Sequence, residues 1–526
     1  MSVLAYAPYG ADGVIIRVEA DIRRGIPGID ISGLAEGAVR EARERVRAAF
    51  RNSGFSFPLD RILINLAPAG LRKYGAALDL PIALAVMTAA GLVSAPSNLM
   101  VMGELELSGR VRPVRGVLAA IAAGLALSPQ EKINGFIVPQ ENQGEAFILG
   151  KKSSQITAVS TLREAYEALV SLEETGNFPK TSINHSINKS SIPIPLYDND
   201  FGDVRGQSTY KRALEIAAAG GHNMLVFGPP GAGKTMLARR LPSIMPLLSF
   251  DEAVEVTKLH SLAGHFRSEE SLITHPPFRT PHHSASAEGI LGGGKSLRPG
   301  EISLAHFGVL FLDEAPEFKA NVLQALREPL EDRVISIARA DGVMRLPAEF
   351  QLLLAANACP CGRLGMNHRE NDYSQGCMCS PQEINGYWKK FGGALLDRIE
   401  LRTAVIPPGT NNISGNSSEE SSAEIAKRIK AALSIQQQRC KGIRRNALIP
   451  AGKIEKFCPL SEDAKAACKK AAAFYGFSGR AYHGILRVAR TIADLDGKEV
   501  IESVHISEAV EHRRYGEDPY EIVTLK

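Results

Sequence analysis

Residues Gly228 to Thr235 have a spacing that could hold a triphosphate. They fit G-x-x-x-x-G-K-[ST], between an apolar run and a helix-forming run in NMLVFGPPGAGKTMLARRL. The glycines let backbone N–H groups face phosphate oxygens at a helix N-terminus. Lys234 would reach the β- and γ-phosphates, and the Thr235 hydroxyl would hold Mg²⁺. The predicted ATP-binding residues are Gly228, Pro229, Pro230, Gly231, Ala232, Gly233, Lys234, Thr235 and Met236.

Two later apolar strands end in polar residues that could complete such a site. GVLFLDEAPEF places Asp313 and Glu314 at a strand end, where one carboxylate could hold Mg²⁺ and the other could deprotonate the attacking water. QLLLAAN ends in Asn357, whose amide could sense the γ-phosphate, although asparagine is also a common turn residue. Beside the first motif, these residues predict ATP hydrolysis.

Four of the seven cysteines stand in one segment, CPCGRLGMNHRENDYSQGCMC. They form two Cys-x-Cys pairs, Cys359 with Cys361 and Cys377 with Cys379. Four thiolates in two close pairs suit a tetrahedral, structural Zn²⁺. The alternative interpretation is four reduced thiols without a ligand.

Composition and apolar patterning predict a soluble, cytosolic, multidomain chain. It has 526 residues, 44% of them hydrophobic, and a formal net charge of +4. That charge is mild, so nucleic-acid binding would need local basic patches. The longest apolar run, Leu80–Val93, is too short to span a bilayer and predicts a helix that begins at Asp79. No targeting signal is recognised, and disulfides are not expected in the cytosol.

Two segments rich in Ser, Asn and Pro divide the chain. The predicted units are an N-terminal domain at 1–175, a linker at 176–200, an ATPase core at 201–406 with the cysteine loop at 359–379, a linker at 407–424 and a helical segment at 425–526. Within the first unit we expect strands at 13–22 and 61–68 and a helix at 38–54. The basic stripe of that helix is either a solvated face or a phosphate-contacting surface; it consists of Arg40, Arg43, Arg47 and Arg51.

The string FRTPHHSASAEGILGGG…RPGEISLAHFGVLFLDEAPEF resembles the Mg-chelatase-like branch of the AAA+ ATPases, and within it the YifB/ComM family. The resemblance extends over essentially the whole chain. It implies an α/β fold: an AAA+ P-loop core with an α-helical lid, preceded by a Lon-protease-like (ribosomal S5 domain 2-like) α+β domain. It also implies a homo-hexamer with ATP at subunit interfaces, acting as a DNA helicase that promotes branch migration during natural transformation. The implied partners are single-stranded, duplex and branched DNA and the recombination machinery.

The resemblance also assigns roles to two arginines. Arg398 in GALLDRIE resembles the arginine finger that reaches a neighbour's γ-phosphate. Arg480 in GFSGRAYHGILRVARTIADL resembles the second sensor arginine on the helical lid. Either could instead be a surface ion-pair residue. Zinc in the cysteine loop would help to hold Arg398 in position.

Two segments could contact DNA. RVISIARADGVMRLPAE predicts a hairpin that turns at residues 341–342, with Arg339 near its tip, where the family has its pore hairpin. The Gly-rich stretch 282–300, with Lys295 and Arg298, resembles the family's pore-facing insertion, whose backbone N–H groups could contact phosphates. The alternative is that both are structural loops at subunit contacts.

The Lon-like resemblance raises the question of proteolysis. In RKYGAALDL, Ala77 stands where the Lon pattern has its serine, and the lysine position falls near Leu118. Neither residue can act as nucleophile or base, so we expect a catalytically inactive scaffold. Two other functions stay open: a Mg-chelatase-type ring acting on a protein partner, and a nucleotide-switched DNA-binding assembly protein without translocation.

Overall fold

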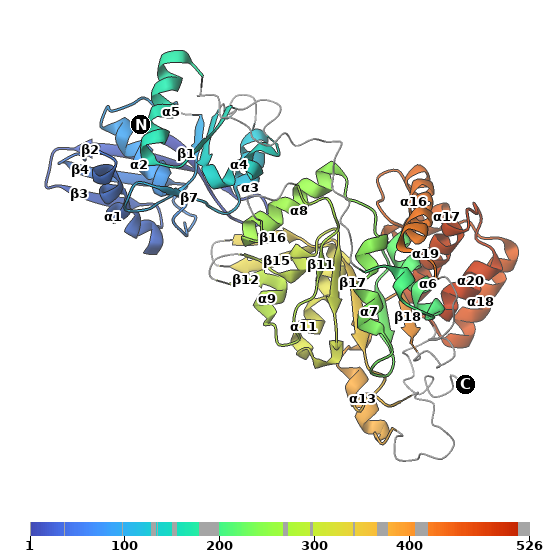
Figure 1. The fold of residues 1–526 in the computed structure, drawn as a ribbon. Coiled ribbons are helices and arrows are strands. Elements are labelled where there is room, and N and C mark those ends of the chain that lie inside the picture. The colour runs from blue at the N-terminus through green and yellow to red at the C-terminus, as the bar shows by residue number, and fades with distance from the viewer. Residues whose placement is uncertain are drawn as a thin grey trace.

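The computed structural model places three groups of elements side by side, an N-terminal group in blue and cyan, a central group in green and yellow, and C-terminal helices in red (Figure 1). Of the two predicted linkers, residues 178–198 and 407–418 lie outside the described part of the chain. The structure describes residues 2–35, 37–96, 98–127, 133, 135–149, 155–177, 199–266, 272–294, 298–339, 342–364, 377–405 and 419–513.

The N-terminal group is built on a mixed seven-stranded sheet with the order β3-β4-β2-β1-β5-β8-β9. Its strands are β1 (Ser2–Ala7), β2 (Val14–Arg23), β3 (Gly28–Ser32), β4 (Arg61–Ala67), β5 (Leu99–Val101), β8 (Gly135–Pro139) and β9 (Gln155–Val159), with a small ribbon of β6 (Glu104–Leu105) and β7 (Val111–Arg112). Its helices are α1 (Gly37–Asn52), α2 (Asp79–Ala89), α3 (Val117–Leu125), α4 (Gln143–Phe147) and α5 (Leu162–Thr175).

Both predicted strands of this group form, and the predicted helix at 38–54 is α1. The arginine stripe of α1 is exposed, and its apolar stripe is buried; the apolar stripe consists of Val39, Ala42, Val46, Ala49 and Phe50. Helix α2 begins at Asp79 as expected, but Leu78 occupies the N-cap position. The buried Asp79 carboxylate instead accepts hydrogen bonds from Arg45, at 2.6 Å from Nε and 2.9 Å from Nη2. This bidentate pair ties α1 to α2.

The central group is a five-stranded parallel sheet with the order β11-β14-β17-β10-β18. Every residue of β10, β14 and β17 is buried, as expected for parallel strands with both faces covered. The sheet strands are β10 (Met224–Phe227), β11 (Phe278–Arg279), β14 (Val309–Leu312), β17 (Gln351–Ala356) and β18 (Leu401–Ala404). The helices are α6 (Ser208–Gly220), α7 (Lys234–Ala238), α8 (Phe250–Ala263), α9 (Ala287–Leu291), α10 (Glu301–Leu304), α11 (Ala320–Ala325), α12 (Arg327–Asp332), α13 (Pro381–Lys389) and α14 (Gly393–Leu396).

The C-terminal helices pack on the central sheet through α6, and one apolar cluster runs through both. They are α16 (Ser422–Arg439), α17 (Ile454–Phe457), α18 (Glu462–Tyr475), α19 (Gly479–Leu495) and α20 (Ser503–Glu511). Among the described residues, no helix has both the length and the apolar character needed to cross a membrane.

A buried polar junction connects the N-terminal group to helix α8 of the central group. The Ser261 hydroxyl donates to the Glu145 carboxylate and accepts from the Gly116 backbone N–H at 2.9 Å. Glu145 also accepts from the Leu118 N–H at 2.7 Å, and burial raises the pKa of its carboxyl. A buried polar group is costly unless it is paired, so this junction fixes α8 against α3.

Ser261→Ala is expected to destabilise the protein by about 2 kcal/mol, because it leaves the buried Gly116 N–H without its partner and removes one hydrogen bond from the buried Glu145 carboxylate. The measurement is the shift of the urea unfolding midpoint. Ser434→Ala, which removes an exposed hydroxyl bonded only to its own helix, is the control and should change little. Equal midpoints for the two variants would contradict the role of Ser261.

Candidate nucleotide-binding site

The segment predicted to bind phosphate forms a turn between β10 and α7, at the carboxyl edge of the parallel sheet. Gly228 has φ +159°, and a Cβ there would lie 2.1 Å from the Val405 carbonyl oxygen. Gly233 lies at φ +85° directly before α7. The backbone therefore follows a path that only glycine tolerates at these two positions.

Lys234 lies at the centre of this turn. Its Nζ donates to the carbonyl oxygens of Gly228 and Pro229 at 2.8 and 2.9 Å, and to Asn357 Oδ1 at 3.2 Å. Burial lowers the pKa of Lys234, and the nearby carboxylates of Asp313 and Glu314 oppose that effect. The ammonium thus lies where the phosphates of ATP would lie. Phosphate oxygens could replace the oxygen atoms that now accept its hydrogen bonds.

Asp313 and Thr235 meet across the gap between β14 and α7. Thr235 Oγ1 donates to Asp313 Oδ2 at 2.8 Å. A hydroxyl and a carboxylate oxygen side by side are the hard donors that Mg²⁺ prefers, so both fit the predicted Mg²⁺ ligand role. Glu314 is exposed and has φ +50°. A non-glycine residue in the left-handed region at a strand end is typical of functional sites.

Two contacts that sequence reasoning missed hold the turn from α6. The Tyr210 hydroxyl donates to the Lys234 carbonyl oxygen at 3.0 Å, and Gln207 Nε2 donates to the Ala232 carbonyl oxygen at 3.0 Å. Both residues come more than twenty positions earlier in the chain. Only the packing of α6 against the turn brings them there, so no local pattern could identify them.

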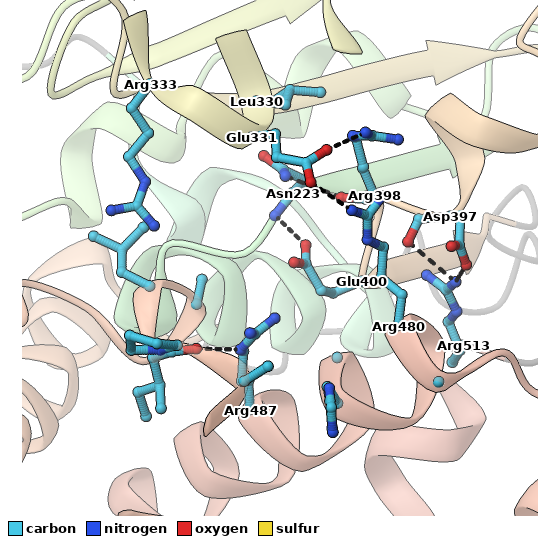
Figure 2. A pocket seen from close by; sticks show the side chains of 18 residues that line it. Asn223, Leu330, Glu331, Arg333, Asp397, Arg398, Glu400, Arg480, Arg487 and Arg513 are labelled. Atoms are coloured by element: carbon cyan, nitrogen blue, oxygen red, sulfur yellow. Dashed lines mark hydrogen bonds and ion pairs between the residues drawn. The ribbon is translucent and has the colours of Figure 1, made fainter. Parts of the chain in front are cut away.

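Arg398 lies at the opposite edge of the sheet. Its carbonyl oxygen accepts from Asn223 Nδ2 at 3.0 Å, and Asn223 directly precedes β10. Lys234 follows the other end of the same strand. Arg480, at the start of α19, lies near Arg398, and both guanidinium groups pair with Glu331 of α12 (Figure 2). The structure thus brings the two predicted arginines together and keeps them away from the phosphate-binding turn of their own chain.

The four cysteines of the predicted zinc loop converge. Their Sγ atoms all lie within 4.8 Å of one another. Cys359 Sγ lies 3.3 Å from Cys361 Sγ and 3.6 Å from Cys377 Sγ. Tetrahedral Zn–S bonds of about 2.3 Å require S–S separations of about 3.8 Å. The described thiols therefore fit a structural zinc ion; residues 365–376 of the loop lie outside the described part.

The position of this cluster corrects one expectation. It follows β17 at the carboxyl edge of the sheet, whereas Arg398 lies at the amino edge, so the cluster does not hold Arg398. It adjoins the phosphate-binding turn instead: a Cβ on Gly362 would lie 2.8 Å from the Pro230 ring and 3.9 Å from Asn357. Loss of the metal should therefore weaken ATP binding more than it disturbs the positions of the arginines.

We expect the purified protein to carry about one Zn²⁺ per chain. Changing both Cys361 and Cys377 to Ser removes two of the four ligands and should release the metal, increase protease cleavage near the loop and weaken ATP binding. Cys458→Ser, which removes a buried thiol outside the cluster, is the control. Elemental analysis of protein isolated without chelators checks this. Metal-free, fully active wild-type protein would contradict it.

The two predicted DNA-contact segments lie side by side. The predicted hairpin is present: β15 (Val334–Arg339) pairs antiparallel with β16 (Gly342–Pro347). Beside it, a Cβ on Gly293 of β12 (Gly292–Gly293) would lie 3.3 Å from Ile337 Cδ1. Arg298 is exposed in β13 (Arg298–Pro299), which pairs with β12. Arg339 ends β15, and the predicted contact Lys295 and turn residue 341 lie outside the described residues.

The hairpin also exposes an arginine that sequence reasoning missed. Arg345 lies opposite Ser336 in the ladder and is exposed, while its neighbours Met344 and Leu346 are buried. Apolar and polar residues alternate along this strand, and this alternation could have predicted that Arg345 is exposed.

A parallel sheet with a phosphate-binding turn, an acidic strand end and a helical lid defines an AAA+ P-loop ATPase core. The sequence comparisons agree. Residues 200–413 match the family model "Magnesium chelatase, subunit ChlI", residues 18–142 match "Subunit ChlI of Mg-chelatase", and residues 419–513 match "Magnesium chelatase, subunit ChlI C-terminal".

Relatives of nearly equal length define the family more closely. The chain is 39% identical over 512 residues to YifB of Salmonella typhimurium, covering 96% of each chain. It is 38% identical over 523 residues to competence protein ComM of Haemophilus influenzae, covering 97% of each. A shorter match, 30% over 197 residues, links 32% of this chain with 35% of Lon protease 2 of Bacillus subtilis. The chain belongs to the YifB/ComM family of Mg-chelatase-like ATPases, and its AAA+ core follows a Lon-protease-like domain.

The family implies ATPase activity with ATP and Mg²⁺. In the Lon-like domain, Leu118 is buried and Ala77 is half-buried, and neither side chain carries a group that could act as a base or a nucleophile.

Proposed function

We propose that this chain is an ATP-driven ring motor on DNA, a homo-hexameric helicase that promotes branch migration when incoming DNA recombines. The observation that carries the proposal is the separation of Lys234 from Arg398 and Arg480 at opposite edges of one sheet. A site split in this way is completed by the neighbouring copy in a ring. The 38% identity to a competence protein supports the biological setting.

In the proposed reaction, the triphosphate takes over the Lys234 ammonium from the carbonyl oxygens of Gly228 and Pro229. Bound at Thr235 and Asp313, Mg²⁺ would neutralise phosphate charge. Glu314 accepts a proton from water, whose oxygen attacks the γ-phosphorus while the bond to the β–γ bridging oxygen breaks and ADP leaves. Asn357 orients the γ-phosphate. Arg398 and Arg480 of the neighbouring copy stabilise the charge on the transferred group.

The β15–β16 hairpin and the neighbouring β12–β13 segment are the proposed DNA-contacting elements. Their described basic side chains are Arg298 and Arg345, and Arg339 and Lys295 belong to the same segments. Contacts from such residues would be made to phosphates, without sequence preference. Proteins of the recombination machinery are proposed partners of the ring.

Arg298→Ala and Arg345→Ala should each weaken DNA binding and lower the slope of log affinity against log salt by about one. Basal ATPase should survive, because neither residue contacts the nucleotide-binding turn. Lys465→Ala, which removes an exposed charge on α18, is the control. Unchanged DNA affinity together with a loss of basal ATPase activity would show that the arginines support the fold and do not contact DNA.

Migration of a synthetic four-way junction is the direct test of the motor. An ATP-dependent shift of the branch point is expected, and none with Lys234→Ala. A Mg-chelatase-type ring acting on a protein would hydrolyse ATP independently of DNA. A nucleotide-switched assembly protein would bind the junction without moving it. Either result would contradict the motor.

A further inference from the structure

The arginine pair lies in a cavity of about 640 Å³ between α12, the segment 397–400 and α19 (Figure 2). Five arginines and three carboxylates line it, so positive groups outnumber negative ones. Two of the carboxylates have other partners in the cavity wall: Asp397 pairs with Arg513 at 3.2 Å, and Glu400 accepts from the Asn223 N–H at 3.0 Å. The third, Glu331, points at Arg398 and Arg480.

Glu331 uses one oxygen for each arginine. Its Oε1 accepts from Arg480 Nη2 at 2.8 Å, and its Oε2 accepts from Arg398 Nη2. The hydrogen bond from Arg398 is the main reason that the pKa of Glu331 lies below its ordinary value. The carboxylate therefore stays ionised, and it occupies donor groups that a phosphate would otherwise use.

The two arginines are held unequally. Arg398 also donates from Nη1 to the Ala394 carbonyl oxygen at 2.6 Å, and its side chain is only 15% exposed. Its buried Nε has no hydrogen-bond partner in the described part of the chain. Arg480 is 42% exposed, and Glu331 is the partner that the structure gives it. Without Glu331, Arg398 would keep its place and Arg480 would be free to turn outward.

We propose that Glu331 is a competing anion that holds Arg398 and Arg480 until a neighbour's γ-phosphate displaces it. The inference rests on the proposed trans arrangement. Carboxylate and phosphate compete for the same guanidinium donors, so each interface closes only when the nucleotide outcompetes Glu331. ATP in the neighbouring site, rather than protein concentration alone, would then decide when the ring assembles.

Glu331→Gln keeps the shape of the side chain and removes its charge. We expect it to lower the ATP concentration at half-maximal oligomer formation by about threefold, the effect of one exposed ion pair. Glu328→Gln, on the same helix and exposed, removes an equal charge and should match wild type. Sedimentation at fixed protein concentration measures this. An unchanged or higher ATP requirement for Glu331→Gln would overturn the proposal.

A second measurement does not depend on the ring. In full-length Lys234→Ala protein, whose own turn lacks its phosphate-binding ammonium, tripolyphosphate stands in for the neighbour's triphosphate. Adding Glu331→Gln should tighten its binding by about threefold in calorimetric titration, whereas adding Glu328→Gln should not. Equal affinities would overturn the role of Glu331. If the affinity for tripolyphosphate changes as expected but ATP causes no variant to assemble, the proposed ring is contradicted. The competition of Glu331 for the two arginines is then still supported.

Discussion

Glu314→Gln is expected to bind ATP with unchanged affinity and to hydrolyse it at least about 100-fold more slowly, because an amide cannot accept the proton of the attacking water. Glu314 is exposed at the end of β14, directly after the Asp313 carboxylate that accepts from Thr235. Glu314 is not among the hydrogen-bond partners of the Lys234 ammonium, so ATP binding and turnover should separate. Fluorescent-nucleotide titration and phosphate release measure the two quantities.

Two further variants serve as comparisons for Glu314→Gln. Glu317→Gln removes an exposed carboxylate three residues further on and should leave turnover unchanged. Lys234→Ala should instead weaken ATP binding by about tenfold or more, because it removes a charge-assisted contact to phosphate. A normal hydrolysis rate in Glu314→Gln would show that another group activates the water.

Arg398→Ala should bind ATP normally and hydrolyse it about 1000-fold more slowly, the effect typical of a lost arginine finger. Within one chain, Arg398 lies across the sheet from Lys234, so its removal should spare the nucleotide-binding turn of its own chain. The control is Arg327→Ala, which removes an exposed arginine on α12 whose side chain hydrogen-bonds to Gln324 in the described part.

Mixing distinguishes a trans contribution from a local one. Arg398→Ala and Lys234→Ala subunits should recover part of the ATPase when combined, since some interfaces then pair an intact turn with an intact arginine. Co-sedimentation of tagged subunits establishes that mixed oligomers form. Mixed oligomers without recovered activity at any ratio would contradict the action of Arg398 on a neighbour.

The sequence predicted those parts of the site that are local in the chain. The turn at Gly228–Thr235 is specified by a strand, glycines and a helix in one continuous segment. The pair Asp313 and Glu314 could be predicted because carboxyl ends of parallel strands share an edge. The convergence of the cysteine pairs could be predicted because two close pairs of thiolates suit one tetrahedral metal ion, even though twelve residues between them lie outside the described part.

Other parts depend on contacts between distant segments. Glu331 lies 67 residues before Arg398 and 149 before Arg480, and it carries no motif. Tyr210 reaches Lys234 only because α6 packs beside the turn. The expected link from the cysteine loop to Arg398 failed for a related reason. The two are near in sequence, but the chain passes through α13 and α14 and returns to the other edge of the sheet before Arg398.

The most direct test of the central claim is the ATPase rate with and without DNA. Purified wild-type protein should hydrolyse ATP faster with single-stranded or duplex DNA and fastest with a branched junction, because a motor couples turnover to its track. The same DNA should leave Glu314→Gln inactive. A rate that none of these DNAs changes, in protein that binds the junction, would contradict an ATP-driven motor on DNA.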